Sequence, residues 1–105
     1  KKIFTALRKP TAVLCASDLM AMGAVRALRE MDLKVPENVS IVGFDNMEEA
    51  HYHDPALTTV SFSGQEMGLL AAQKLIQLLE GETLKSKGTT LQAELIVRDS
   101  ALPLH

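Results

Sequence analysis

Short polar side chains stand at the ends of two apolar runs in this sequence, and they are its candidates for ligand chemistry. Ser17 and Asp18 follow the run 11–16, and Asp45 follows the run 39–44. Two carboxylates and a hydroxyl placed together can accept hydrogen bonds from the hydroxyl or amino groups of a small polar ligand. The sequence therefore predicts a polar binding rim built from Ser17, Asp18 and Asp45.

Each of these side chains also has a structural interpretation. Asp45 stands three residues before Glu48 and can cap a short helix, and one carboxylate can do both with different lone pairs. Asp18 is predicted mainly as the N-cap of the helix that follows it, with Ser17 as the alternative cap. Position alone therefore leaves both ligand contact and helix capping open at this rim.

The other reactive side chains do not form a catalytic or metal-binding pattern. His51 and His53 flank Tyr52 and are predicted to have a surface or interface role, because no further ligand stands at a supporting spacing. Cys15 lies within an apolar run, which is typical of a buried thiol rather than a nucleophile. The sequence has no Gly-x-Ser-x-Gly motif and no glycine-rich phosphate loop. We therefore predict neither an enzyme, nor a metal site, nor a cofactor.

Alternating strand and helix signals position these residues. Short, mostly apolar runs predict strands over residues 11–16, 39–44, 57–62 and 91–97. N-cap patterns and apolar residues at three- and four-residue spacing predict helices over residues 18–31 and 63–80. Between them, a turn is predicted at residues 45–46, followed by a short helix that ends at residue 52. This order predicts an α/β fold with a mostly parallel sheet flanked by helices. In such sheets ligands bind beyond the carboxyl ends of the strands, which is where the polar rim stands.

Length and composition indicate one globular domain. The 105 residues match a single domain in size, and 47% of them are hydrophobic. Eleven basic and thirteen acidic residues give a net charge of −2, so this stretch lacks the clustered cations of a nucleic-acid-binding surface. No apolar run is long enough to span a membrane. Because the chain begins at Lys1 without a signal-peptide pattern, we expect a soluble, excised piece of a larger protein.

Three stretches in this order resemble the LacI/GalR family of bacterial transcription regulators. They are PTAVLCASDLMAMGA at residues 10–24, VPENVSIVGFDN at residues 35–46, and DPALTTV at residues 54–60, followed by Met67-Gly68. The resemblance covers residues 10 to about 100 and implies a two-lobed, periplasmic-binding-protein-like type I fold. Residues 1–105 would form the C-terminal lobe, with helix 63–80 belonging to the other lobe. The DNA-reading headpiece would lie outside the chain.

The resemblance implies roles for individual residues of an effector site. Asp45 matches the family's effector-contacting aspartate in its Gly-[Phe/Tyr]-Asp motif, and Ser17 stands where many sugar-responsive members carry asparagine. Asp18 is included in the same effector site. Met67 matches a position that can line the cleft from the other lobe. A sugar or a nucleobase-like metabolite is the expected effector.

The resemblance also implies a homodimer of a cytoplasmic repressor or related regulator. The first helix and the segment after Asp45 would build much of the interface, through Met22, Val25, Arg26, Tyr52 and His53. Operator DNA would bind only through the missing N-terminal headpiece. The alternative is a periplasmic sugar-binding protein of a transport system, which shares the fold. The runs at residues 35–37 and 54–60 favour the regulator.

Helix 63–80 carries an apolar stripe with no other lobe in this chain to cover it. Its members are Met67, Leu70, Ala71, Leu75, Leu78 and Leu79. Leaving such a stripe in water costs roughly 1.5–3 kcal/mol per large side chain. We therefore expect the isolated chain to swap or dock this helix against a second copy, and to bind ligand weakly or not at all.

Overall fold

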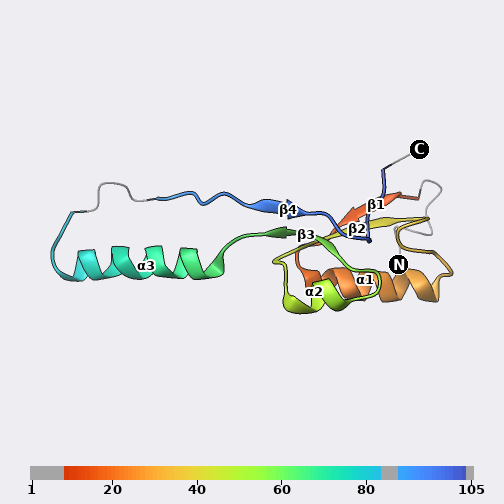
Figure 1. Ribbon diagram of the computed structural model, residues 1–105, viewed down its shortest axis with the longest axis horizontal. Coiled ribbons are helices and arrows are strands. Elements are labelled where there is room, and N and C mark those ends of the chain that lie inside the picture. Colours follow the sequence, from red (N-terminus) through yellow and green to blue (C-terminus); the bar gives the residue numbers. More distant parts are fainter. Residues whose placement is uncertain (1–8, 84–87, 104–105) are drawn as a thin grey trace. The chain divides into compact units, whose positions relative to one another are not determined.

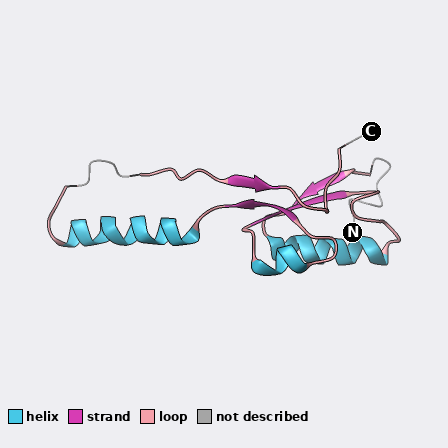
Figure 2. Ribbon diagram, viewed as in Figure 1, coloured by secondary structure: helices cyan, strands magenta, loops and turns pink. Residues whose placement is uncertain are grey.

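The computed structural model describes residues 9–83 and 88–103, in which strands and helices alternate along the chain (Figure 1). Figure 2 distinguishes the strands from the helices. The strands are β1 (Ala12–Leu14), β2 (Ser40–Phe44), β3 (Thr58–Ser61) and β4 (Glu94–Ile96). The helices are α1 (Asp18–Glu30), α2 (Glu48–Tyr52) and α3 (Gly64–Leu79). Two compact units result: the described residues up to Ser61 and from Glu94 onward form the sheet unit, and Phe62–Ala93 form the α3 unit.

The sheet unit holds, within the described residues, a four-stranded sheet in the order β1-β2-β3-β4. β1 pairs with β2 and β2 pairs with β3 in parallel, whereas β4 runs antiparallel to β3. The segments containing α1 and α2 make the parallel pairs possible, because parallel strands need a long connection that returns the chain to the same edge. The predicted α/β fold with a mostly parallel sheet is therefore confirmed.

The core of the sheet unit lies between the sheet and the helices α1 and α2 (Figure 1). Ala21, Val25 and Leu28 stand at four- and three-residue spacing on α1 and are all buried. They pack in one cluster with Ile41 of β2. Each large apolar side chain that leaves water contributes roughly 1.5–3 kcal/mol. Val25, only 1% exposed, thus belongs to this core rather than to the dimer interface for which it was predicted.

Serine side chains begin the two longer helices. Ser17 is the N-cap of α1, because its Oγ accepts a hydrogen bond from the Met20 amide at 3.1 Å. Asp18 is already helical, so the alternative cap is the correct one and the predicted cap at Asp18 is wrong. The predicted cap of α3 is confirmed: Ser63 Oγ accepts from the Glu66 amide at 3.1 Å.

The short helix α2 begins later than the sequence predicts. Its N-cap is Met47, which makes no side-chain capping hydrogen bond. Asp45 and Asn46 precede it with φ angles of 113° and 58°, both in the left-handed half of backbone space. The predicted capping pair of Asp45 and Glu48 is therefore wrong, because a turn separates Asp45 from the first helical residue.

The outer strands are shorter than the apolar runs that predicted them. β4 covers only the middle of the run 91–97. Its first residue, Glu94, pairs with Ser61, which is the last residue of β3. The pairing with β3 therefore covers residues 94–96 of the predicted run 91–97.

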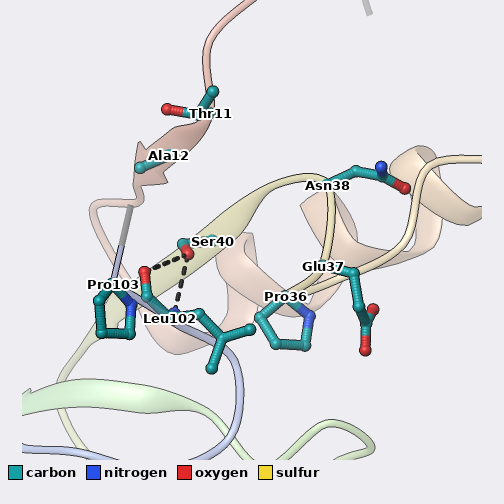
Figure 3. Close-up of a pocket in the computed structure, with 8 residues that line it drawn as sticks. All are labelled: Thr11, Ala12, Pro36, Glu37, Asn38, Ser40, Leu102 and Pro103. Atoms are coloured by element: carbon teal, nitrogen blue, oxygen red, sulfur yellow. Dashed lines mark hydrogen bonds between the residues drawn. The ribbon is translucent and has the colours of Figure 1, made fainter. Parts of the chain in front are cut away.

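The segment after β4 forms hydrogen bonds with both β2 and β3. The Ile41 amide donates to the Ser100 carbonyl at 2.8 Å, and Ser100 Oγ donates to the Ile41 carbonyl at 2.6 Å. The same hydroxyl accepts from the Thr58 amide at 2.8 Å. Further along, Ser40 and Leu102 share two hydrogen bonds beside a cavity of about 310 Å³ at the amino ends of β1 and β2 (Figure 3).

The α3 unit consists of a 16-residue helix and the described residues that flank it. No side chain of α3 is buried. More than half of the side-chain surface is exposed at Leu69, Leu75, Ile76, Leu78 and Leu79. Gly81 ends the helix with a φ of 81°, as its predicted left-handed cap position requires. Among the described residues, no helix is both long and apolar enough to cross a membrane.

Candidate functional site

The carboxyl ends of β1 and β2 bring the predicted polar rim together. The two strands are parallel neighbours, so the loops that follow them leave the sheet at the same edge. The Met47 amide, two residues after Asp45, donates to Asp18 Oδ2 at 2.7 Å and ties the loops directly to each other. Ser17, Asp18 and Asp45 therefore lie on adjacent loops, but their surroundings differ.

Asp45 is exposed at this edge of the sheet. Its amide donates to the Val60 carbonyl of β3 at 3.0 Å, which fixes the backbone. Among the described residues, none hydrogen-bonds to the Asp45 carboxylate. A carboxylate on a fixed backbone with free lone pairs can accept hydrogen bonds from a ligand's hydroxyl or amino groups.

Ser17 is half-buried next to the loop that carries Asp45. Its Oγ uses one lone pair to cap α1 through the Met20 amide. A hydroxyl has two lone pairs and one proton, so Ser17 can still donate a hydrogen bond to a ligand while it caps the helix. The two interpretations left open by the sequence are therefore compatible at this residue.

Asp18 is fully buried, and both of its carboxylate oxygens are engaged. Oδ1 accepts from Thr59 Oγ1 at 2.6 Å, and Oδ2 accepts from the Met47 amide at 2.7 Å. This carboxylate therefore joins α1, β3 and the turn before α2. Its geometry supports a positional role behind the rim rather than the effector contact for which it was predicted.

Gly43 makes the burial of Asp18 possible. A Cβ atom at position 43 would lie 2.2 Å from Asp18 Oδ1 and 3.2 Å from Asp18 Cα. Real Cβ atoms essentially never show a contact of 2.2 Å, and a contact of 3.2 Å is tighter than most, so a side chain at position 43 would force Asp18 to move. Glycine therefore allows the close approach of β2 to the first turn of α1. The glycine of the Gly43-Phe44-Asp45 motif thus has a steric role, distinct from the polar role of Asp45.

Asn46 and Arg98 form a second part of the site, which sequence reasoning missed. Arg98 Nη2 donates to Asn46 Oδ1 at 2.7 Å, and Asn46 Nδ2 donates to Ser61 Oγ at 3.4 Å. The other arm of Arg98 donates to the Leu57 carbonyl at 2.9 Å. The two residues lie 52 positions apart, so no local pattern could reveal their pairing.

The predicted interface residues have unequal exposure. Arg26 and Tyr52 are exposed, with 75% of Tyr52 accessible, and Arg26 Nε lies 3.6 Å from Glu30 Oε1. Met22 and His53 are half-buried. These four residues remain candidates for an interface, in contrast to the core residue Val25.

The remaining candidates are a methionine of the α3 unit and the cysteine that follows β1. Met67 is 47% exposed on α3, in the α3 unit, and its role in an effector cleft stays a prediction. Cys15 is buried, and burial raises the pKa of its thiol, which disfavours the nucleophilic thiolate. Over the described ranges, no group of three His, Cys, Asp or Glu side chains is placed to hold a metal ion.

Comparison with known proteins identifies the family. A periplasmic binding protein-like domain matches residues 1–101. The chain belongs to this family. CytR of Escherichia coli, a transcriptional repressor of the helix-turn-helix type, is 43% identical over 96 residues, which cover 90% of this chain and 28% of CytR. PurR of Erwinia tasmaniensis, another such repressor, is 38% identical over 100 residues, which cover 95% of the chain and 29% of PurR.

Solved structures place the chain among LacI-type regulators, as the sequence motifs predict. The regulator CelR, in complex with cellobiose, has a TM-score of 0.82 at 37% identity, with 87% of this chain and 28% of CelR covered. The lac repressor dimer bound to operator and the anti-inducer ONPF has a TM-score of 0.82 at 36% identity, with coverages of 90% and 32%. The curated relatives are transcriptional repressors and not enzymes. The chain spans less than a third of the length of these curated relatives.

Proposed function

We propose that this chain is the effector-sensing and dimerisation part of a LacI-type transcription repressor. The observation that carries the proposal is the exposed carboxylate of Asp45, on a fixed turn at the carboxyl edge of a parallel sheet. The relatives with this domain are named as transcriptional repressors, which favours a regulator over a transport receptor. The parent protein would bind operator DNA through a headpiece outside these residues and act in the cytoplasm.

The effector is a small metabolite with hydroxyl or amino groups, such as a sugar or a nucleobase-like compound. Asp45 would accept hydrogen bonds from it, and Ser17 would donate one while capping α1. Asp18 would hold the two loops in place without touching the ligand. Met67 would contribute an apolar contact to the face of a ring. The bound cellobiose of the structural relative CelR supports a sugar as the first candidate.

The α3 unit would belong to the second lobe of the parent protein. The division of the chain into two compact units supports this assignment. The exposed leucines of α3 support it as well, because such a surface is stable only when another element covers it. An effector bound between two lobes stabilises one arrangement of the lobes only if it binds that arrangement more tightly than the other.

The parent would act as a homodimer through the surface that carries Met22, Arg26, Tyr52 and His53. Tyrosine, methionine and arginine are enriched in the cores of protein interfaces. The lac repressor, a structural relative, is a dimer when bound to its operator. The parent with Tyr52→Asp should therefore sediment as a monomer at concentrations at which the unaltered parent is a dimer. A dimer of undiminished stability would contradict this interface.

Replacement of Asp45 by asparagine in the full-length parent tests the effector site. We expect Asp45→Asn to weaken binding of cellobiose by about ten- to hundredfold, since a hydrogen bond to a charged group contributes about 1.5–3 kcal/mol. Calorimetric titration with cellobiose measures this loss, and operator affinity without ligand should stay unchanged. Glu37→Gln is the matched control, because Glu37 is an exposed carboxylate at the opposite edge of the sheet.

Two outcomes would count against the effector site. Ligand binding that is equal in Asp45→Asn and in the unaltered parent would remove Asp45 from the site. If the unaltered parent does not bind cellobiose, the titration is repeated with galactosides and nucleosides. Failure of all three classes to change operator affinity would contradict the sugar or nucleobase-like effector.

A further inference from the structure

The turn that carries Asp45 has an unusual backbone. Asp45 and Asn46 are consecutive non-glycine residues with φ angles of 113° and 58°. Side chains disfavour this half of backbone space, and such residues persist only where the surrounding structure holds them. The conformation of the turn therefore depends on contacts made from outside it.

Hydrogen bonds hold the backbone amides of the three residues of this turn, Asp45, Asn46 and Met47. The Asp45 amide donates to the Val60 carbonyl at 3.0 Å, and the Met47 amide donates to Asp18 Oδ2 at 2.7 Å. Between them, the Asn46 amide donates to Thr59 Oγ1 at 3.3 Å. These backbone contacts define where the turn lies relative to β3 and α1.

The side-chain amide of Asn46 makes two further hydrogen bonds, one through its nitrogen and one through its oxygen. Its Nδ2 donates to Ser61 Oγ at 3.4 Å, and its Oδ1 accepts from Arg98 Nη2 at 2.7 Å. Arg98 is itself fixed, because Nη1 donates to the Leu57 carbonyl and its amide donates to Thr58 Oγ1, both at 2.9 Å. The guanidinium thus links the turn to the start of β3 with a planar, two-armed geometry that lysine cannot reproduce.

We propose that Asn46 and Arg98 are positioning residues of the effector site, which fix the direction in which Asp45 presents its carboxylate. Neither residue needs to touch the ligand. Asn46 prevents the turn from relaxing, and Arg98 holds Asn46 against β3. This inference rests on the proposed effector role of Asp45.

Asn46→Gly in the full-length parent separates this role from simple relief of strain. Glycine adopts a φ of 58° without cost but removes both side-chain contacts. We expect the amides of Asp45 and Met47 to exchange with solvent about tenfold faster, as the loss of one to two hydrogen bonds implies. The core amide of Ile41 should exchange at its original rate. Arg98→Met should have the same local effect, whereas Lys34→Met, which removes an exposed cation elsewhere, should have none.

The experiments on Asn46 and Asp45 can fail independently, so they test the positioning role separately from the proposed function. Unchanged exchange at Asp45 and Met47 in Asn46→Gly, or equally faster exchange at Ile41, would overturn the positioning role. In a parent that binds cellobiose, Asn46→Gly should also raise the Kd by about tenfold, and an unchanged Kd would likewise overturn it. If Asp45→Asn leaves cellobiose binding intact, the proposed function fails, while the exchange rates still decide whether Asn46 and Arg98 hold the turn.

Discussion

At the scale of single residues, the two acidic side chains of the rim have opposite tasks. Asp45 is exposed and free to accept hydrogen bonds, whereas Asp18 is fully buried with both oxygens engaged. The same chemical group can therefore bind a ligand at one position and hold the fold together at another, on the neighbouring loop. Burial and partners decide between the two tasks, and the residue type does not.

Gly43→Ala tests the close approach between β2 and Asp18. The added methyl group would meet Asp18 Oδ1 at 2.2 Å, and displacement of a buried, hydrogen-bonded carboxylate is costly. We expect the free energy of unfolding to fall by about 1–3 kcal/mol, as for other overpacked sites. Urea unfolding monitored by circular dichroism measures the change.

Gly23→Ala is the matched control for this substitution. Gly23 lies in α1, and a Cβ atom there meets nothing within 4 Å. Alanine should raise the free energy of unfolding by roughly 0.5–1 kcal/mol, because glycine is a poor helix former. Equal effects of the two substitutions would contradict the steric explanation of Gly43.

At the scale of elements, the segment after β4 contributes more than its length suggests. Ser100 is fully buried and replaces a strand partner for both Ile41 and Thr58. Its hydroxyl bridges the Ile41 carbonyl of β2 and the Thr58 amide of β3. The stability of the parallel sheet thus depends on residues at the far end of the sequence.

Ser100→Ala should lower the free energy of unfolding by about 1–3 kcal/mol, because the Thr58 amide loses its partner in a buried place. Thermal unfolding followed by calorimetry provides the measurement. Thr90→Ala, which removes a hydroxyl from an exposed position before β4, should stay within about 0.5 kcal/mol of the unaltered chain. A Ser100→Ala variant as stable as Thr90→Ala would show that the hydroxyl is dispensable.

At the scale of the whole molecule, the exposed apolar surface of α3 has a high free-energy cost in water. None of its side chains is buried, although leucine and isoleucine predominate in its second half. In the parent, a second lobe would cover this surface. When residues 1–105 are prepared alone, we expect a second copy to take that place.

Sedimentation of the isolated chain tests this association. We expect a concentration-dependent dimer, and the double variant Leu75→Glu, Leu79→Glu should be monomeric, because each leucine is more than half exposed on α3. Gln73→Glu with Gln77→Glu is the control, since it adds the same charge to the same helix without removing apolar surface. A monomer of the unaltered chain at high concentration would contradict the prediction.

Local patterns in the sequence were sufficient for the element order, the mostly parallel sheet, the cap at Ser63, and the position of Ser17 and Asp45 on adjacent loops, whereas they offered Ser17 only as the alternative cap of α1. These features depend on residues near one another in the chain and on general rules of strand connection. The burial of Asp18, the core position of Val25 and the left-handed backbone at Asp45 and Asn46 needed the folded chain. Arg98 and Ser100 act on partners about 40 to 60 residues away, and contacts of that separation form only when packing brings the segments together.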